Sequence, residues 1–464
     1  MIHKSLAQIA AMIPGAAVDE ASSKLMITGV SRDTRELQVG RLYVPIIGER
    51  FDGHSYVAEA ASKGAAAAFW QRDHGAAPTG VPVVLVDDSL VALQQLASAY
   101  RAQLPIKVIG ITGSNGKTST KDMVAAIAGE QFNTLKTKGN YNNEIGLPLT
   151  LLELDDHMEI AVLEMGMSGY GEIELLSRIA KPDIAIITNI GEAHMLQLGS
   201  REGIAKAKLE IIAGLQPGGV LIYDGDEPLL SQRVEELMKQ RNIRCIRFGH
   251  SERNEYYPCD IRISAECTEF SAVRAADGSR LIDLRIPLLG RHNAVNALSA
   301  IAAGEIIGLT EKSIHSGLAR MTPTGMRIET VHASNGAVLL NDTYNASPAS
   351  MTAALRLLEE LQVAGRKIVV LGDMLDLGPE SEHYHREIGR SLSPEHFHAV
   401  FTHGELAAYI AMECEERFPP GTIEAYTDKQ ALISRLRGWI KPQDTLLFKA
   451  SRGQQLEEIV EALM

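Results

Sequence analysis

The chain has 464 residues and a net charge of −13, because 58 acidic residues outnumber 45 Lys and Arg residues. This acidic balance argues against a protein that wraps nucleic acid or adheres to anionic lipid, so any phosphate site must be local. The length is too great for one compact core, and with 45% apolar residues it predicts several globular domains, of which we expect three.

Residues 1–101 are rich in Gly and Ala and contain two short apolar runs, 42–46 (LYVPI) and 82–86 (PVVLV). Short aliphatic runs bounded by Gly and polar residues are typical of strands. We therefore expect residues 1–101 to form a smaller α/β domain.

From Pro105 onward, aliphatic runs alternate with Gly or polar residues and with stretches of helical spacing, which is the rhythm of βαβ units. Near-continuous apolar runs are typical of parallel strands that are buried on both faces. The predicted strands are 107–112, 160–164, 183–189 and 220–224, and one predicted helix spans 119–130. The pattern predicts a central doubly wound domain over residues 102–323.

A second βαβ series follows and predicts a separate, Rossmann-like C-terminal domain over residues 324–464. Its predicted strands are 338–341, 367–372, 399–402 and 445–449. The boundary is placed near Thr322–Gly325, because Pro323 and Gly325 end the helical segment SIHSGLARM.

The four cysteines, Cys245, Cys259, Cys267 and Cys414, match neither a metal knuckle nor a CxxC pair, so we expect reduced thiols. The N-terminal segment lacks a continuous apolar stretch before a cleavage site. No run approaches the roughly 18 apolar residues of a membrane span. We therefore expect a cytoplasmic protein, and a monomer.

The segment 110–120 (GITGSNGKTST) follows a predicted strand and opens a predicted helix, which is the context of a phosphate-binding loop. Gly113 and Gly116 would let backbone N–H groups approach phosphates, Lys117 would neutralise the β- and γ-phosphate charge, and Thr118 would coordinate Mg²⁺. The alternative is a glycine-rich turn with a solvated lysine. The expected nucleotide-binding residues of this P-loop ATPase-like domain are Gly110, Thr112, Gly113, Ser114, Asn115, Gly116, Lys117, Thr118 and Ser119.

The spacing of this loop is unusual, because Gly110 lies six residues before Gly116, one more than the common P-loop has. In its form GxxGxxGKT the loop resembles that of the Mur ligase and folylpolyglutamate synthetase superfamily, and the resemblance covers essentially the whole chain. It implies an ATP-dependent ligase that activates a carboxylate as an acyl phosphate and joins it to an amine.

Metal ligands are expected at the ends of two predicted strands. Glu164 lies at the carboxyl edge of the sheet, where open α/β folds bind ligands, and would coordinate Mg²⁺. The resemblance implies that His194 holds a second Mg²⁺, although a lone His is usually structural. It also implies that Lys208 is carbamylated and helps to hold that ion, and Lys208 is preferred to Lys206 by motif alignment only.

Further nucleotide contacts are implied by the same resemblance. His292, Asn293 and Asn296 resemble the adenine-contacting stretch, where amides suit a base edge, although the asparagines could instead cap a helix. Arg327 resembles the arginine that reaches the ATP phosphates, and Asp342 the nucleotide-contacting acidic residue. The ATP site would then be completed only when the C-terminal domain closes, which would exclude water.

Three groups of residues are candidates for binding the other substrates. The N-terminal runs SRDTR and FDGH resemble the UDP-binding domain of Mur ligases that act on uridine-linked muramoyl peptides. The amide-rich loop 137–148 could hydrogen-bond a peptide or sugar, and the strand end at 449–452 could receive a carboxylate. The candidates are Ser31, Asp52, Gly53 and His54, then Asn140, Asn142 and Asn143, and last Lys449, Ser451 and Arg452.

Within the family, the segments 137–152, 163–173 and 372–385 look most like the members that add D-alanyl-D-alanine to UDP-N-acetylmuramoyl-tripeptide. No DNPR-like motif, typical of the members that add the third residue, is found. A folylpolyglutamate synthetase is the nearest alternative, but such enzymes begin close to the ATP loop, which residues 1–101 precede here. A P-loop regulatory switch is a different class, and the absence of an NKxD motif argues against it.

Overall fold

The computed structural model describes residues 1–48, 51–240, 243–264 and 266–464. Its internal contacts divide the chain into two interleaved units. The first unit comprises residues 1–112, 132–185 and 210–221, and the second comprises 113–131, 186–209 and 222–464. The domain boundaries 1–101, 102–323 and 324–464 remain a prediction.

The N-terminal part of the first unit contains a five-stranded sheet in the order β2-β7-β6-β5-β4. The strands are β2 (Ala17–Val18), β4 (Val30–Ser31), β5 (Leu42–Tyr43), β6 (Ala67–Gln71) and β7 (Val83–Val86). All neighbours are parallel except β2 and β7. A two-stranded antiparallel sheet of β1 (His3–Ser5) and β3 (Met26–Thr28) and the helices α1 (Leu6–Ala11), α2 (Val57–Ser62) and α3 (Ser89–Arg101) complete this part.

The remainder of the first unit contains three parallel strands, with β10 (Ile160–Glu164) between β8 (Lys107–Thr112) and β9 (Thr134–Lys136). The strands β8 and β10 have the predicted bounds and are almost wholly buried. Glu164 pairs with Ile111, so its side chain leaves β10 close to where β8 enters the glycine-rich loop. The helices α5 (Gly146–Leu152) and α6 (Glu172–Ala180) belong to this part.

The second unit begins with α4 (Lys117–Ala128), which packs against α10 (Arg291–Ile306) and α11 (Glu311–Arg320). The predicted strands near 183–189 and 220–224 are β11 (Ile184–Ile187) and β12 (Val220–Asp224), and each crosses from the first unit into the second. The helices α7 (Met195–Leu198) and α8 (Arg201–Leu209) lie between these two strands in the chain, and α9 (Pro228–Gln240) follows β12. The strands β13 (Arg244–Phe248), β14 (Tyr256–Ile263), β15 (Thr268–Arg274) and β16 (Arg280–Ile286) follow, and β15 pairs antiparallel with both β14 and β16.

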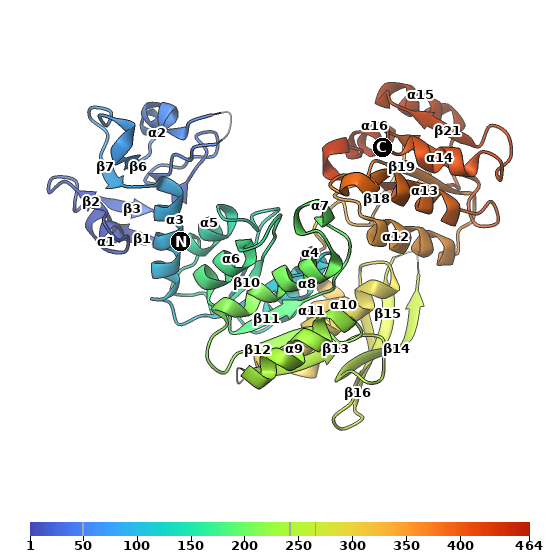
Figure 1. The fold of residues 1–464 in the computed structure, drawn as a ribbon, viewed down its shortest axis with the longest axis horizontal. Coiled ribbons are helices and arrows are strands. Elements are labelled where there is room, and N and C mark those ends of the chain that lie inside the picture. The colour runs from blue at the N-terminus through green and yellow to red at the C-terminus, as the bar shows by residue number, and fades with distance from the viewer. Residues whose placement is uncertain (49–50, 241–242, 265) are drawn as a thin grey trace. The chain divides into compact units, whose positions relative to one another are not determined.

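The C-terminal part of the second unit is a six-stranded sheet in the order β17-β18-β22-β19-β20-β21, parallel except at β17. The strands are β17 (Glu329–His332), β18 (Val338–Asp342), β19 (Lys367–Gly372), β20 (Ala399–His403), β21 (Ile423–Tyr426) and β22 (Thr445–Lys449). Two separate apolar clusters, one on each face of this sheet, make it a three-layer domain (Figure 1). The helices of one face are α12 (Pro348–Glu360), α13 (Ser381–Ser391) and α14 (Ala408–Cys414), and those of the other are α15 (Lys429–Trp439) and α16 (Glu457–Leu463).

The predicted α/β class with parallel sheets is confirmed. In the C-terminal sheet, parallel strands bring the carboxyl ends of β18, β22, β19 and β20 to one edge, where ligands of open α/β sheets bind. All four cysteines are free thiols, as expected. Among the described residues, no helix is both long enough and apolar enough to cross a membrane.

Candidate active site

Two glycines give the phosphate loop its shape. Gly113 and Gly116 have φ of 147° and 78°, a region that side-chain-bearing residues rarely adopt. A Cβ on Gly113 would lie 1.9 Å from Oγ1 of Thr188, and one on Gly116 would lie 2.7 Å from Nδ2 of Asn296. Only glycine fits at either position, so the loop can wrap closely around a small anion before α4 begins.

The loop is held from behind by two residues that follow β11. Asn189 accepts a hydrogen bond from the Asn115 N–H at 2.9 Å through its Oδ1 and donates to the Asn115 carbonyl at 3.1 Å through its Nδ2. The Thr188 hydroxyl donates to the same carbonyl at 2.5 Å. Neither residue was predicted from the sequence, although a polar pair at the carboxyl end of a predicted strand is a usable signal.

The polar groups of the loop suit phosphate. The Lys117 ammonium donates to the carbonyls of Gly113 at 2.8 Å and Ser114 at 3.3 Å, so it lies over the loop. The Ser114 hydroxyl is buried and has no hydrogen-bond partner among the described residues. The ammonium, the buried hydroxyl and the N-terminal N–H groups of α4 are all donors on one short segment, and such a set of donors suits the phosphates of ATP.

His194 is placed next to this loop by the turn before α7, where its φ is 67°. Burial, then the nearby ammonium groups of Lys208 and Lys117, lower the pKa of His194 to about 4, while Asp376 opposes the shift. The imidazole is therefore neutral at pH 7 and keeps a lone pair for a metal ion. This chemistry fits the predicted role.

Burial distinguishes the two lysines of α8. Lys208 is 1% exposed, whereas Lys206 is an exposed residue on the same helix. Glu192 was not predicted from the sequence either, and its Oε2 is buried without a hydrogen-bond partner among the described residues. A carboxylate oxygen two residues before His194 is a donor that Mg²⁺ prefers.

In the first unit, the carboxylate of Glu164 is 3% exposed and accepts a hydrogen bond from Nδ2 of Asn142 at 2.8 Å. The Glu164 N–H donates to Oγ1 of Thr137 at 3.0 Å. Asn143 accepts from the Gly146 N–H at 2.9 Å, at the start of α5. In this structure, Asn142 therefore orients Glu164 and Asn143 supports a helix, while Asn140 is exposed.

The predicted adenine contacts lie at the N-terminal end of α10. Asn293 donates to the Leu289 carbonyl at 2.9 Å, Asn296 lies against Gly116 of the phosphate loop, and His292 lies beside Gly290. The N-cap of α10 is Gly290, without a side-chain cap. The capping alternative is therefore wrong, and the adenine role stays a prediction.

The candidates at the carboxyl edge of the C-terminal sheet have protein partners. The Lys449 ammonium lies 2.6 Å from Oδ2 of Asp342 in a buried ion pair, which joins two residues for which separate ligand roles are predicted. The Ser451 hydroxyl accepts from the Leu375 N–H at 2.9 Å. Arg452 pairs with Glu457 at 2.6 Å but is half exposed, so it is the most accessible of the three predicted dipeptide-binding residues.

The C-terminal part also contacts the phosphate loop. The hydroxyl of Ser347, which caps α12, donates to Oδ1 of Asn115 at 3.3 Å. Arg327 lies in the segment before β17, with its guanidinium carbon 4.3 Å from the centroid of the Tyr344 ring. Ser347 is thus the point at which the C-terminal part is seen to contact the phosphate loop, whereas Arg327 lies against Tyr344.

In the N-terminal part of the first unit, Asp52 connects two histidines. Its carboxylate lies 2.8 Å from Nδ1 of His54 and 2.6 Å from Nε2 of His74, and it also accepts the His54 N–H at 2.9 Å. The two imidazoles stack with centroids 4.1 Å apart. Desolvation alone would raise the pKa of Asp52, but the hydrogen bonds from both histidines outweigh it and lower the pKa to about 2.

The His54 side chain is 0% exposed, so it is placed to support Asp52 rather than to contact a ligand directly. The ligand atoms of Asp52, His54 and His74 lie within 4.8 Å of one another, as in a metal site. However, Nε2 of His54 accepts the Gln71 N–H at 3.4 Å, so its Nδ1 carries the proton that Asp52 accepts and offers no lone pair. Ser31, another residue predicted for UDP binding, is buried, and its hydroxyl donates a hydrogen bond to the Asp33 carbonyl at 3.1 Å.

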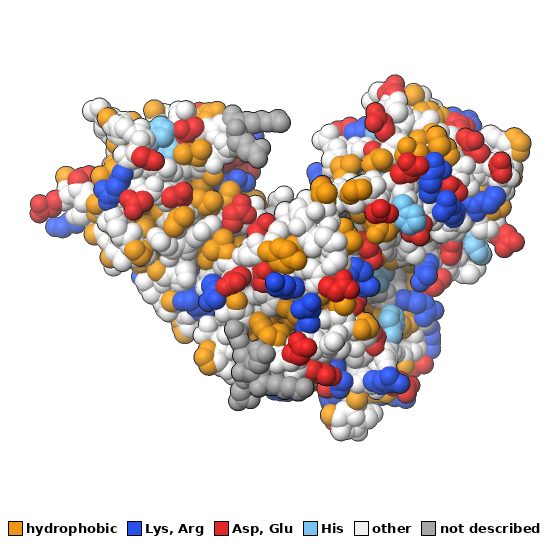
Figure 2. Space-filling model, viewed as in Figure 1, with side chains coloured by type: hydrophobic (Ala, Val, Ile, Leu, Met, Phe, Trp, Pro, Cys, Tyr) orange, Lys and Arg blue, Asp and Glu red, His pale blue; other side chains and the backbone are white. Residues whose placement is uncertain are grey.

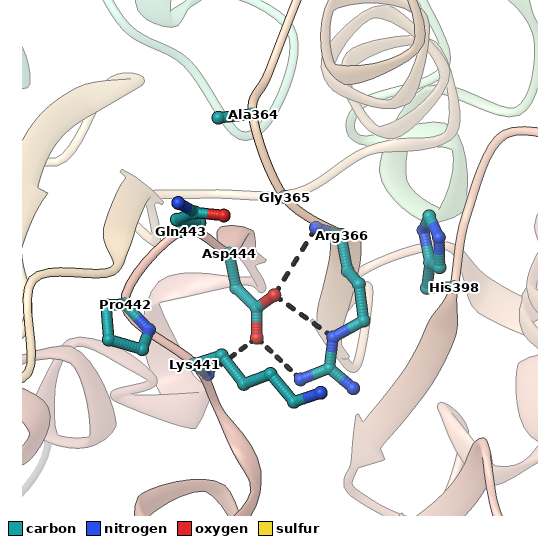
Figure 3. Close-up of a pocket in the computed structure, with 8 residues that line it drawn as sticks. All are labelled: Ala364, Gly365, Arg366, His398, Lys441, Pro442, Gln443 and Asp444. Atoms are coloured by element: carbon teal, nitrogen blue, oxygen red, sulfur yellow. Dashed lines mark hydrogen bonds and ion pairs between the residues drawn. The ribbon is translucent and has the colours of Figure 1, made fainter.

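A hollow in the C-terminal part lies away from these residues (Figure 3). It is lined by the turns that precede β19, β20 and β22, at the amino ends of these strands. At its centre Arg366 and Asp444 form an ion pair at 2.6 Å, and Arg366 also stacks on Trp439. Because these charges satisfy each other at the edge opposite the candidate residues, the hollow is not the active site.

On the face shown in Figure 2, acidic and basic side chains are interspersed.

Comparisons with known proteins match three successive parts of the chain to family models. Residues 26–101 match "Mur ligase family, catalytic domain", 111–304 match "Mur ligase middle domain", and 326–452 match "Mur ligase, glutamate ligase domain". The UDP-N-acetylmuramoyl-tripeptide–D-alanyl-D-alanine ligase of Bacillus subtilis is 47% identical over 464 residues, which cover 100% of this chain and 99% of that protein.

Two solved structures are similar over nearly the whole chain. A crystal structure of MurF from Acinetobacter baumannii has a TM-score of 0.88 at 29% identity and covers 100% of this chain and 99% of its own. MurF ligase from Thermotoga maritima in complex with ADP has a TM-score of 0.81 at 27% identity and covers 94% and 96%. The chain belongs to the Mur ligase family.

Proposed function

We propose that the chain is an ATP-dependent ligase that joins D-alanyl-D-alanine to UDP-N-acetylmuramoyl-tripeptide in the cytoplasmic synthesis of peptidoglycan precursors. The observation that carries this proposal is the 47% identity over the full 464 residues to a ligase of that name. It is supported by a phosphate loop in which two glycines, a lysine and a buried hydroxyl are placed for ATP.

The first chemical step is the attack of the tripeptide carboxylate on the γ-phosphorus of ATP. The bond to the ADP oxygen breaks, ADP leaves, and an acyl phosphate forms. Lys117 and Arg327 would stabilise the charge that develops on the transferring phosphoryl group. Donors that are already oriented in a buried site stabilise such charge most effectively, because little reorganisation is needed.

In the second step the free amine of D-alanyl-D-alanine attacks the acyl carbonyl. A tetrahedral intermediate forms, phosphate leaves, and the nitrogen loses a proton to give the amide. The substrate residues proposed for the dipeptide are Lys449, Ser451 and Arg452. Of these three residues, Arg452 has the most exposed side chain, so its guanidinium is accessible to a carboxylate in this structure.

Mg²⁺ fits the donor chemistry of this chain, because a neutral imidazole and buried carboxylate oxygens are present. We propose that Thr118, Glu164, His194 and a carbamylated Lys208 hold two ions. Mg²⁺ bound there would neutralise charge on phosphate oxygens. Burial of Lys208 supports its choice over Lys206.

The uridine-linked substrate is assigned to the N-terminal part. We propose that Ser31, Asp52 and Gly53 lie in its UDP-binding region, with His54 as a support for Asp52. Binding energy from this remote part of the substrate would not require a catalytic group there.

The proposal is tested by measuring ADP and phosphate release with a panel of UDP-muramoyl peptides and amine acceptors. Turnover should require both UDP-N-acetylmuramoyl-tripeptide and D-alanyl-D-alanine. Turnover with a folate and glutamate would instead identify a folylpolyglutamate synthetase, and nucleotide binding without any product would identify a regulatory switch.

Titration with UDP should give a heat of binding that disappears when the peptide substrate is present as a competitor. The absence of a heat of binding would remove the muramoyl assignment. Sedimentation should give a monomer.

A further inference from the structure

Two charged residues are buried in the helix that follows the phosphate loop. Lys121 and Asp122 lie on α4 with side chains 1% and 2% exposed, and their charges are 3.4 Å apart. A buried carboxylate needs further donors to offset its loss of hydration. For Asp122, two of these come from Thr324, 202 residues along the chain.

The bonds from Thr324 tie the linker after α11 to the nucleotide helix. Oδ2 of Asp122 accepts the Thr324 N–H at 2.9 Å and its hydroxyl at 2.7 Å. Hydrogen bonds to an ionised carboxylate are about twice as strong as neutral ones, and two from one residue also fix its orientation. Thr324 is therefore a fixed point on the second unit's ATP-binding part.

A second fixed point follows two residues later. The Met326 carbonyl accepts the Tyr344 N–H at 3.2 Å, and its sulfur contacts Nη1 of Arg452 at 3.2 Å. Both partners belong to the C-terminal sheet region. Between the two anchors only Gly325 remains, so the position of Thr324 largely determines where the linker enters the C-terminal sheet region.

The segment beyond the anchors carries signs of a functional constraint. Met326 and Ile328 have φ of 61° and 54°, which is strained for side-chain-bearing residues and most of all for a β-branched one. Between them Arg327 has a buried Nε without a hydrogen-bond partner among the described residues. Strain and an unsatisfied donor at one arginine are typical of a group held for a ligand.

We propose that Asp122 is a positioning residue for the ligase reaction: it holds Thr324 on the helix that carries the phosphate loop, and so fixes the start of the linker that delivers Arg327 to the transferring phosphate. This inference rests on the proposed function. If the anchor is lost, Arg327 samples more orientations and the chemical step slows, since catalysis depends on a narrow range of geometry. The nucleotide itself, bound by the loop, is not touched.

The test uses Thr324→Val, which removes the hydroxyl and keeps the size and the N–H. The kcat should fall about tenfold, because one charge-assisted hydrogen bond is lost, while KM for ATP and Kd for ADP stay within about twofold. Thr324→Ser keeps the hydroxyl and should retain kcat within about twofold of the wild type. Thr330→Val, the same change at an exposed position on β17, is the matched control.

Asp122→Asn tests the partner, because it keeps one acceptor oxygen and nearly the same volume. It should lower kcat, and adding Thr324→Val to it should cost less than Thr324→Val alone, since both changes break one contact. Three results would overturn the proposal. The kcat losses of Asp122→Asn and Thr324→Val could be fully additive in the double variant, or Thr324→Ser could lose as much kcat as Thr324→Val. The third is a kcat for Thr324→Val equal to that of Thr330→Val. The proposed function itself would be refuted if the wild type released no phosphate in a reaction that requires both substrates.

Discussion

The phosphate loop and the cluster of Asp52, His54 and His74 use their polar groups in opposite ways. In the loop, the Ser114 hydroxyl is buried without a partner among the described residues, and the Lys117 ammonium donates to the carbonyls of Gly113 and Ser114 in its own turn. In the cluster, Asp52 receives bonds from both histidines, and His54 is sealed from solvent. A motif residue can therefore serve a ligand directly or by holding a neighbour, and burial and bonding distinguish the two.

The largest expected effect comes from Lys117→Ala, because the loop then loses its charge at the transferring phosphate. Turnover should fall by about 10³-fold, while the thermal midpoint changes little, since no core packing is removed. Phosphate release and a thermal melt of the same preparation provide the measurement. Near-normal release would mean that the loop does not bind the reacting phosphates.

Lys208→Ala should lower turnover by about 100-fold, because a group that helps to hold a metal ion is removed. Millimolar acetate should restore part of the activity by replacing the carbamate. Lys206→Ala, on the exposed side of the same helix, is the control and should stay near the wild type. The choice of lysine is wrong if the control is the damaging change and acetate has no effect.

Asp52→Ala and His54→Ala sharpen the contrast with the loop. Both should raise KM for the UDP-muramoyl peptide about tenfold and leave KM for ATP and for D-alanyl-D-alanine nearly unchanged. His54→Ala should in addition lower the free energy of unfolding by about 2 kcal/mol, because it leaves a cavity in place of a fully buried side chain. Steady-state kinetics and chemical denaturation measure the two effects, and an unchanged peptide KM in both variants would contradict the UDP assignment.

The smallest expected effect is on stability in acid. The pKa of Asp52 is about 2 in the folded protein, below its usual value near 3.9 when unfolded, so the ionised carboxylate stabilises the fold above about pH 4. This contribution is lost as the pH falls from about 4 through about 2. The stability gap between the wild type and Asp52→Asn should therefore narrow over this range in a pH series of melts. A constant gap would show that the hydrogen bonds to Asp52 do not depend on its charge.

Much of the fold could be predicted from local pattern. The strands β8, β10, β12, β19 and β22 have the predicted bounds, because buried parallel strands are near-continuous apolar runs. The helix α4 begins two residues before its predicted start, at Lys117, because the left-handed Gly116 ends the loop there. The antiparallel strands β14 to β16 were not predicted, since their buried residues are interrupted by polar ones and by irregular register.

The site could be predicted only where chemistry is encoded within one segment. The glycine-rich loop is of this kind. Asn189 was missed because it acts on Asn115, 74 residues away, and Asp122 because its partner is 202 residues away. His74 and Glu192 belong to no motif, and only the folded chain shows that His74 bonds to Asp52 and that a carboxylate oxygen of Glu192 is buried.

The geometry at Gly113 has a consequence for inhibitor resistance. A methyl group there would collide with the Thr188 hydroxyl, whose own hydrogen bond holds the loop, and the φ of 147° disfavours any side chain. A compensating change would need to displace Thr188 and would loosen the loop that it supports. A compound that contacts the backbone of Gly113 would therefore bind to a surface that single substitutions at this residue cannot change. We expect selection against such a compound to yield changes in expression or uptake, and not at this residue.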